Sequence, residues 1–427
     1  MRLGRIFFTA LVVLTLGAAI TVAAASAATA HVGGPAGPAG AAPIAQAAGQ
    51  QQCAEPYSTT RDPANPLALP VAPGSNPLQG AKFFVNGPAH GVAAKAIAQA
   101  VGLNPALEPD SESWAAFANR LTTGPLAGKL AANAGLANKV RQLSKIAAEP
   151  EVQRVSAFSR GGKRGGVFLQ TQKLLCKNIA ADPGSVPILN TYFLNPAAGH
   201  CPRPRAIRAA SATFKRRVNE FVDAIDLRPV VLLLETDSIG TSSCVQRVGS
   251  LGIWESLLRY EISKATGLPH AVVYTEAGYS DANSVGYTAR VLNAIGVRRI
   301  RGFYTNDTHL NWTINEVRWA NKVSARTGRV HYIVNTGQSG AGPLLNKHPR
   351  RQGIENLCNP PGRALGPRPT TNTGFALADA WLWTSPPGNS SGCGGGPPAA
   401  SFWVARAVGL AARANGRLGP GFPSQPY

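Results

Sequence analysis

Residues 230–238 read VVLLLETDS, an unbroken apolar run that ends in two carboxylates. Such a run is typical of a strand that is buried on both faces, as in a parallel sheet covered by helices. The acids are therefore expected at the carboxyl end of that strand. There Asp237 is a candidate general acid, although on pattern alone it is equally well explained as the cap of a following helix.

Similar apolar runs recur on both sides of this strand and alternate with stretches of helical periodicity. Repeated strand–helix units predict a parallel sheet with helices outside it. Six or more units favour a closed or nearly closed barrel, whose chemistry lies at the carboxyl ends of the strands. The expected strands are 186–193, 230–234, 271–274, 300–304, 330–334 and 380–383, and the expected helices are 206–226, 245–265, 284–295 and 314–327.

The chain before the barrel has three sections of different composition. Residues 1–27 have a basic start, an apolar run and an Ala-Ser-Ala cleavage pattern, which predicts an export signal, with an uncleaved anchor as the alternative. Residues 28–52 are rich in Ala, Gly and Pro and predict a flexible spacer. Within the remaining domain, 53–427, residues 91–148 have helical spacing and predict several short helices.

The cysteines and the net charge indicate which classes of protein the chain can belong to. None of the six cysteines forms a Cys-x-x-Cys pair or has a His at ligand spacing, so three disulfides are expected in a secreted chain and a zinc site is not. The formal charge of +21 suggests an anionic partner. Its basic clusters lack interleaved aromatics and any nucleic-acid module, so a solvated basic surface is the favoured interpretation.

Polar and aromatic side chains also follow the other expected strands. Amides and hydroxyls give directional hydrogen bonds and aromatic faces stack on sugar rings, so this mixture suits a carbohydrate. Taken alone, the aromatics are more often part of a core. The residues are Glu276, Tyr279, Asn306, Trp312, Asn335, Ser385 and Asn389.

Several segments resemble glycoside hydrolase family 6, the endoglucanases and cellobiohydrolases. The strongest are residues 358–369 (CNPPGRALGPRP) and 379–383 (DAWLW). Residues 234–238 resemble the family's Glu-Pro-Asp-Ser segment, and residues 80–86 and 306–313 resemble two further motifs, all in family order. The resemblance implies a distorted parallel β/α barrel, TIM-like and seven-stranded, in which residues 91–148 are an N-terminal helical insertion.

The resemblance also implies a function and a site. The chain would be a secreted glucanase that hydrolyses β-1,4-glucosidic bonds of a cellulose-type polysaccharide with inversion, without metal or organic cofactor. We expect a monomer whose partner is a β-glucan polysaccharide or oligosaccharide, with no nucleic-acid partner and no membrane partner after signal cleavage. Asp237 would be the proton donor, with Tyr192 and His200 near the scissile bond. The sugar path would be lined by Glu276, Tyr279, Asn306, Trp312, Asn335, Arg363, Trp383, Ser385 and Asn389. The family's two usual disulfides map onto Cys201–Cys244 and Cys358–Cys393, which leaves Cys53 and Cys176 as a third pair.

The segment that holds the family's proposed catalytic base is altered. Its Lys, Glu and Asp positions carry Ser385, Asn389 and Ser391 here, and His200 stands where an assisting Asp is expected. The loss of a general base costs a factor of roughly 10²–10⁴ in rate.

Three interpretations of this loss stay open. His200 acts as the base, or Glu276 or Asp281 has moved into the role, or the fold is a non-catalytic glycan-binding or cell-envelope protein. An enzyme for a different, anionic polysaccharide is a further alternative, suggested by the lost acids and the charge of +21.

Overall fold

The computed structural model describes residues 67–69, 71–72, 74–156, 164–199, 201–343, 358–424 and 427. All described residues belong to one compact unit of the chain. The expected leader and spacer, residues 1–52, lie outside the described residues, as do Cys53 and His200. No helix among the described residues is long and apolar enough to cross a membrane.

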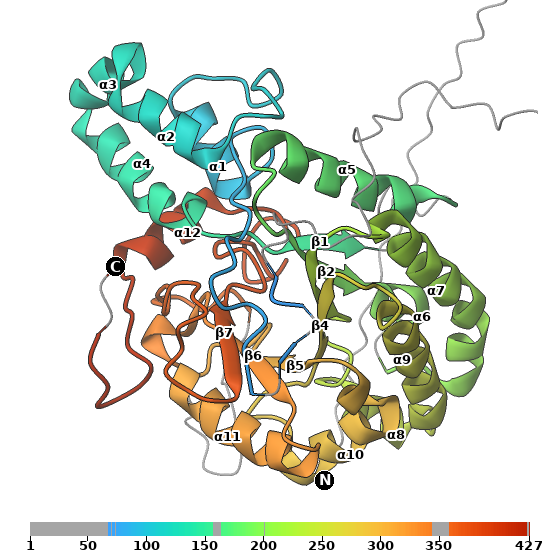
Figure 1. Cartoon of the computed structure of the whole chain (residues 1–427). Coiled ribbons are helices and arrows are strands. Elements are labelled where there is room, and N and C mark those ends of the chain that lie inside the picture. Colours follow the sequence, from blue (N-terminus) through green and yellow to red (C-terminus); the bar gives the residue numbers. More distant parts are fainter. Residues whose placement is uncertain are drawn as a thin grey trace, which may run out of the picture. The chain divides into compact units, whose positions relative to one another are not determined.

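Seven parallel strands form one sheet in which each strand pairs with its neighbours in the sequence. They are β1 (Gln153–Ser156), β2 (Ile188–Tyr192), β3 (Val230–Leu234), β4 (Ala271–Glu276), β5 (Gly302–Thr305), β6 (His331–Asn335) and β7 (Ala378–Leu382). The sheet curls round (Figure 1), and its edges β1 and β7 are not paired with each other within the described residues. The predicted seven-stranded parallel barrel is thus confirmed, in an open form.

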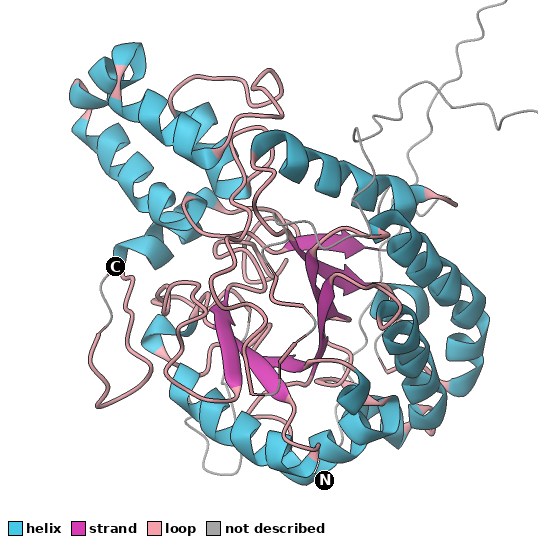
Figure 2. Cartoon of the chain, in the orientation of Figure 1, coloured by secondary structure: helices cyan, strands magenta, loops and turns pink. Residues whose placement is uncertain are grey.

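Helices connect consecutive strands and cover the outside of the sheet (Figure 2). α5 (Gly166–Ala181) follows β1, and α6 (Leu194–Ala198) and α7 (Pro204–Ile225) follow β2. α8 (Ser242–Arg247) and α9 (Leu251–Ala265) follow β3, α10 (Val285–Ile295) and the 3-10 helix η2 (Val297–Arg299) follow β4, and α11 (Thr313–Arg326) follows β5. The connection from β6 to β7 includes the 3-10 helix η3 (Ser339–Ala341).

Strand β3 shows why the sheet needs helices on one face and a filled interior on the other. Val230, Leu232 and Leu234 belong to the apolar cluster between sheet and helices. Val231 and Leu233 belong to a second cluster, which is built from the strands and fills the barrel. Alternate side chains point to opposite faces of a strand, so a run of five apolar residues buries both faces.

In the described part of the chain before β1, four helices form the predicted helical insertion. They are α1 (Val92–Ala100), α2 (Trp114–Thr122), α3 (Gly124–Ala131) and α4 (Ala134–Ala147). Their apolar core is shared with α12 (Val404–Ala412), the helix after β7, and α4 lies beside α12 (Figure 1). Lys145 on α4 donates a hydrogen bond to the Ala411 carbonyl at 3.0 Å. The helices that adjoin the two edge strands therefore pack against each other.

Two local features differ from the sequence-based expectation. The sequence does not predict β1, because Gln-Arg-Val-Ser holds one apolar residue, and this edge strand pairs only with β2. The expected helix 245–265 is divided into α8 and α9, because Gly249 between them has a left-handed φ of +72°.

Candidate active site

The two acids after β3 have different surroundings. Glu235 is fully buried, and its carboxylate accepts hydrogen bonds from the backbone N–H groups of Phe193 (2.8 Å) and Leu194 (2.9 Å). Burial raises the pKa of Glu235 to about 7, although these hydrogen bonds oppose the rise. Glu235 thus fixes the start of α6, whereas Asp237 is half-buried and reaches the open end of the strands.

The Asp237 carboxylate belongs to a hydrogen-bonded cluster at the carboxyl ends of β3, β4 and β5. Its Oδ1 accepts hydrogen bonds from the hydroxyls of Tyr279 and Thr308, the latter at 3.2 Å. Thr308 also contacts the Tyr279 hydroxyl at 2.8 Å. Asp237 does not cap α8, because the N-cap of that helix is Thr241. The capping interpretation of Asp237 is therefore wrong.

The backbone at these strand ends adopts left-handed conformations. Glu235, Asp237 and Asn306 have φ values of +51°, +60° and +66°. This conformation strains the backbone of residues that have a Cβ, and such strain is common at functional sites. The left-handed turn separates Glu235, which is directed inward, from Asp237, which is directed to the open end.

The ring of Tyr279 is held between His309 and Gly240. Its ring stacks on His309 with centroids 3.6 Å apart and planes 3° from parallel. The ring of His309 is in turn bonded through Nδ1 to Asp281 Oδ1 at 2.8 Å. Gly240 lies against the Tyr279 ring so closely that a Cβ on Gly240 would be 2.6 Å from the ring carbon Cε2. The hydroxyl that contacts Asp237 therefore has little freedom to move.

Glu276 does not line an open path. It is fully buried, and its carboxylate accepts the backbone N–H groups of Ile239 (2.6 Å), Gly240 (2.9 Å) and Gly278 (2.5 Å). Burial raises its pKa to about 8, against the effect of these hydrogen bonds. The expectation that Glu276 contacts sugar or acts as a base is corrected: with no exposed surface, it holds the loop behind Asp237.

Asn306 and Asn335 also have a structural role at the strand ends. Asn306 is 1% exposed and donates to the carbonyls of Asn311 (3.2 Å) and Asn335 (2.9 Å). Asn335 is 5% exposed and donates to the carbonyls of Asn306 and Asp307, both at 2.9 Å. These amides join the ends of β5 and β6, so the expectation that they face a sugar is corrected.

A second group of side chains gathers at the ends of β1, β2 and β7. The guanidinium of Arg154 lies over the Tyr192 ring, 5.4 Å from its centroid. Arg154 also donates to Asn190 Oδ1 at 3.3 Å and to Ser385 Oγ at 3.5 Å. Arg154, Tyr192 and Ser385 are half-buried. The contact from Arg154 to Ser385 crosses the unpaired edges of the sheet.

Asp307 lies beneath this second group and was not among the residues expected at the site. It is 3% exposed, and its Oδ1 accepts hydrogen bonds from Thr384 Oγ1 (2.5 Å) and Ser385 Oγ (3.4 Å). Burial raises its pKa, the Arg154 guanidinium opposes this rise and the Asp237 charge adds to it. The sequence could have indicated Asp307, because this acid comes directly after the strand β5, within Asn-Asp-Thr-His. Arg154 was missed together with β1.

The remaining expected residues lie elsewhere or within the core. Trp383 is 2% exposed and belongs to the core of the helical insertion, so it is not a sugar-stacking surface. Trp312 packs against the core at the start of α11. Arg363 donates to the Gly342 carbonyl at 2.7 Å, and Asn389 lies in a turn bridged to Phe402. None of these four has a described hydrogen bond to the group around Asp237.

The disulfides Cys201–Cys244 and Cys358–Cys393 are present, which confirms two of the three expected pairings. The first joins the segment before α7 to α8, so it braces the chain on either side of Asp237 in the sequence. Cys176 is also disulfide-bonded, and its expected partner Cys53 lies outside the described residues.

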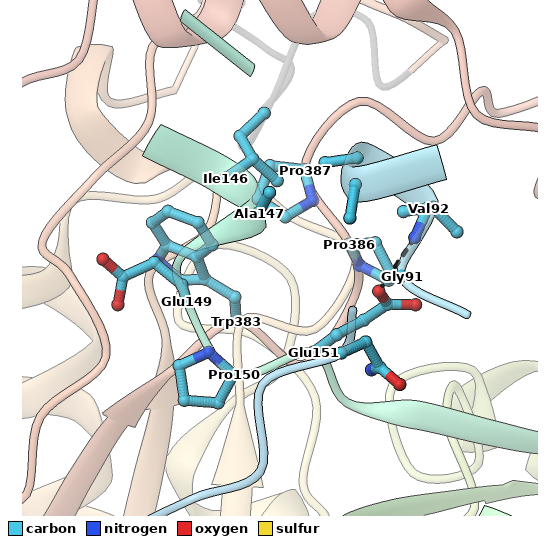
Figure 3. Close-up of a pocket in the computed structure, with 13 residues that line it drawn as sticks. Gly91, Val92, Ile146, Ala147, Glu149, Pro150, Glu151, Trp383, Pro386 and Pro387 are labelled. Atoms are coloured by element: carbon cyan, nitrogen blue, oxygen red, sulfur yellow. Dashed lines mark hydrogen bonds between the residues drawn. The ribbon is translucent and has the colours of Figure 1, made fainter. Parts of the chain in front are cut away.

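A separate pocket lies where the helical insertion meets the chain after β7 (Figure 3). Glu151 lines it and accepts the backbone N–H of Val92, the first residue of α1, at 3.1 Å. Pro386 and Pro387 form another part of its lining. The insertion therefore supports the segment that carries Ser385, whereas the pocket itself does not include Asp237.

The described geometry brings a carboxylate with an open oxygen, Asp237, to the end of the sheet. Across the strand ends stand a cation, an aromatic ring and a hydroxyl, from Arg154, Tyr192 and Ser385, with Asp307 beneath them. A positioned carboxyl group can transfer a proton to a ligand, and the other groups can bind hydroxyl-bearing rings. This arrangement fits acid-assisted cleavage of a sugar bond.

Comparisons with known proteins agree with this interpretation. Residues 205–414 match the model of the family described as glycosyl hydrolases family 6. Endoglucanase 1 of Streptomyces sp. (strain KSM-9) is 29% identical over 240 residues, which cover 54% of this chain and 62% of that protein. Endoglucanase A of Cellulomonas fimi is 29% identical over 276 residues, covering 64% and 56%. The chain thus spans about three fifths of the length of these two curated relatives.

Solved structures share the fold over most of their length. The endoglucanase Cel6 from Mycobacterium tuberculosis, in complex with a methyl-cellobiosyl thio-cellobioside, matches with a TM-score of 0.60 and 27% identity, covering 79% of this chain and 99% of that one. Endoglucanase CEL6B from Humicola insolens matches with a TM-score of 0.56 and 19% identity over 80% and 99%. The second likeness concerns the fold alone.

Proposed function

Since the chain is a divergent member of glycosyl hydrolase family 6, we propose that it is a glucanase that hydrolyses β-1,4-glucosidic bonds of a cellulose-type polysaccharide. The observation that carries this proposal is the environment of Asp237. It is half-buried at the carboxyl ends of the strands and is held by Tyr279 and Thr308. The relatives are named as endoglucanases, which supports the same class of substrate.

Asp237 is the proton donor in this proposal. Two hydroxyls donate to its Oδ1, and no described residue donates to Oδ2. Oδ2 is therefore the oxygen that carries the proton and gives it to the departing glycosidic oxygen. Protonation of the leaving group by a positioned acid contributes a factor of roughly 10²–10⁴ in rate.

Inversion at the anomeric carbon is the second part of the proposal. It requires water to attack from the face opposite the acid, so two groups with acid–base function must flank the bond, roughly 6.5–9.5 Å apart. Arg154 lies on β1, Tyr192 ends β2 and Ser385 follows β7, and all three side chains are half-buried. We assign sugar contacts to these three side chains and to the exposed Thr308.

The test is release of reducing sugar from a soluble β-1,4-glucan across pH 4–9, a range chosen for the assay. Wild-type protein is compared with Asp237→Ala and with Asp223→Ala, which alters an exposed acid on α7. We expect activity in the wild type and in Asp223→Ala, and a loss of roughly 10²-fold or more in Asp237→Ala. Equal activity in Asp237→Ala would remove this residue from the mechanism.

The alternative is a non-catalytic glycan-binding or cell-envelope protein. The segment after β7 favours it, because Ser385, Asn389 and Ser391 stand where the resemblance expects charged groups. Titration calorimetry with cellohexaose distinguishes the two functions. Binding without turnover by the wild type at every pH tested supports the alternative, and turnover excludes it.

An anionic polysaccharide is the other substrate class to test, because Arg154 places a cation at the strand ends and the chain has a formal charge of +21. Salt screens charge–charge contacts, so binding of an anionic glycan weakens steeply with salt whereas binding of a neutral glucan does not. Neutral cello-oligosaccharides that fail to bind at any salt concentration would contradict the β-glucan assignment.

The proposal extends to the processing of the chain. Residues 1–27 are proposed as a removed export signal, residues 28–52 as a spacer and residues 53–427 as the catalytic domain of a secreted monomer. N-terminal sequencing of the exported protein tests the cleavage site, and light scattering tests the monomer. An intact N-terminus on the exported protein would favour a membrane anchor.

A further inference from the structure

Asp307 has a buried carboxylate oxygen that no described residue satisfies. Oδ1 accepts hydrogen bonds from Thr384 and Ser385, whereas Oδ2 is shielded from solvent and has no hydrogen-bond partner among the described residues. The Thr236 hydroxyl is close enough to lower the pKa of Asp307, but it donates to Asn190 Oδ1 instead, at 2.8 Å. Buried polar atoms in native proteins are nearly always hydrogen-bonded, because an unsatisfied one costs about 1–3 kcal/mol. An orphan oxygen next to an active site therefore calls for a functional explanation.

The charges around Asp307 place it in the electrostatic environment of Asp237. The titratable groups that act on it, or on which it acts, come from five elements and are Arg154, Tyr192, Asp237, Glu276, Tyr279 and Tyr304. Arg154 is the cation among them and opposes the effect of burial. Asp307 is thus a second acidic group beside Asp237, with a guanidinium that favours its charged form.

Ser385 connects this buried acid to the open end of the strands. It is half-buried, its hydroxyl donates to Asp307 Oδ1 at 3.4 Å, and Arg154 approaches the same hydroxyl at 3.5 Å. These distances are long for hydrogen bonds. Catalytic hydrogen bonds are often long in the absence of substrate and shorten when the substrate is bound.

We propose that Asp307 and Ser385 together take up the proton of the attacking water, with Ser385 as the group that touches the water and Asp307 as the final acceptor. The inference rests on the proposed function. Water oxygen bonds to the anomeric carbon as the bond from that carbon to the leaving oxygen breaks. The Asp237 proton passes to the leaving oxygen, the water proton passes to Ser385 Oγ, and the Ser385 proton passes to Asp307.

Asp281 is the rival carboxylate, and its position argues against it. Its Oδ1 is bonded to His309 and to the Asn311 side chain, at 2.8 and 2.7 Å. His309 stacks on Tyr279, the residue that contacts Asp237. Asp281 is therefore connected to the proton donor through His309 and Tyr279, and none of its described hydrogen bonds goes to the segment after β7. Asp307 is joined instead to the segment after β7.

Two substrates separate the roles of acid and acceptor. On soluble β-glucan, Asp237→Ala and Asp307→Asn are both expected to lose roughly 10²–10⁴-fold in kcat. Dinitrophenyl β-cellobioside has a leaving group that departs without a proton, so Asp237→Ala regains activity on it and Asp307→Asn does not. Asp223→Asn, the same chemical change on an exposed face of α7, keeps the wild-type rate on both substrates.

The coupling of the two residues is tested by a double mutant. We expect Ser385→Ala to lose roughly 10–10²-fold, and the double variant Asp307→Asn/Ser385→Ala to be no worse than Asp307→Asn, because groups that act as a unit are non-additive. Thermal unfolding and cellotetraose binding confirm that each variant is folded. If Asp307→Asn does not fold, Ser385→Ala alone tests the inference through its rate and its pH profile.

The pH profile and azide rescue exclude a merely structural role. The acidic limb of kcat against pH is expected to vanish in Asp307→Asn, and sodium azide is expected to restore the rate of Asp307→Ala by attacking in place of water, giving an α-glycosyl azide. Wild-type rates with an unchanged acidic limb in Asp307→Asn overturn the inference. Azide rescue of His200→Ala but not of Asp307→Ala also overturns it.

The failure of the proposed function has a different signature. A wild-type protein that hydrolyses neither substrate contradicts the glucanase proposal, and the proton-acceptor role falls with it. A wild type that hydrolyses both substrates, together with a fully active Asp307→Asn, leaves the glucanase intact and overturns only the assignment of Asp307.

Discussion

The ends of β3 and β4 are far more constrained than the end of β7. At β3 and β4, two buried carboxylates, Glu235 and Glu276, accept five backbone N–H groups and fix the loops on both sides of Asp237. At β7, Ser385 makes only long contacts to Asp307 and Arg154. The loops on the proton-donor side are thus held by buried carboxylates, whereas the segment after β7 is held by neutral amide side chains and backbone carbonyls.

This difference indicates which side of the site tolerates change. A carboxylate that holds three backbone N–H groups cannot be replaced without leaving donors unsatisfied, so the surroundings of Asp237 are restricted. In the segment after β7, neutral amide side chains take this part: Asn335 accepts the Thr384 N–H and Asn359 accepts the Ser391 N–H, one donor each. The segment after β7 has lost the charged residues that the resemblance expects, so its sequence can change more freely. The role of proton acceptor can then pass to the end of another strand, β5, where Asp307 lies.

The largest expected effect is on the restricted side. Glu276→Ala leaves the N–H groups of Ile239, Gly240 and Gly278 without their acceptor. We expect the free energy of unfolding to fall by roughly 3 kcal/mol or more, measured by urea denaturation. Ser391→Ala, on the β7 side, is the matched control with an expected change within about 0.5 kcal/mol. Similar losses in the two variants would remove the contrast between the sides.

The second prediction concerns pH and stability. Burial raises the pKa of Glu276 to about 8 and that of Glu235 to about 7, above the unfolded value of about 4.3. Between these values the unfolded chain releases protons that the folded chain keeps, so the stabilisation is complete below pH 4 and is lost as pH rises towards 8. We expect Glu276→Gln to reduce the decline of unfolding free energy from pH 5 to 8 by about 2 kcal/mol. Parallel curves for variant and wild type would contradict this.

The third prediction is a moderate effect on rate. Tyr279→Phe removes the phenol that donates to Asp237 but keeps the ring on His309. The loss of one hydrogen bond to a charged group, about 1.5 kcal/mol, corresponds to a roughly tenfold lower kcat/KM on β-glucan. Tyr287→Phe, whose hydroxyl contacts Ser242 at 3.1 Å, controls for the loss of a tyrosine hydroxyl elsewhere. A Tyr279→Phe variant as active as Tyr287→Phe would show that the phenol does not assist Asp237.

The smallest expected effect is at Asn389. This residue lies in a turn bridged to Phe402 and has no described contact with Asp307 or Asp237. Asn389→Asp returns a carboxylate to the segment after β7, and we expect kcat to change by less than about twofold, because no described hydrogen bond joins this half-buried residue to Asp307 or Asp237. A large gain in rate would mean that this segment, and not Asp307, is the natural place of the proton acceptor.

The sequence predicts most of the barrel because its strands are long apolar runs buried on both faces. It does not predict β1, whose polar residues belong to an edge strand. It also finds the two acids after β3 but cannot separate their roles, because the left-handed turn that directs Glu235 inward depends on donors from the end of β2. Trp383 was misplaced for a similar reason: the insertion that buries it precedes the barrel in the sequence.

Closure of this barrel depends on its helices. Since β1 and β7 do not pair within the described residues, the contact between α4 and α12 takes the place of the seventh line of backbone hydrogen bonds, which would close the barrel. Backbone pairing has a fixed spacing of about 4.8 Å, whereas packed side chains set a spacing that depends on their size. Single substitutions on α4 and α12 can therefore change the width of the opening at the strand ends while every strand keeps its register. Evolution can adjust the space for a ligand in this way without altering the sheet.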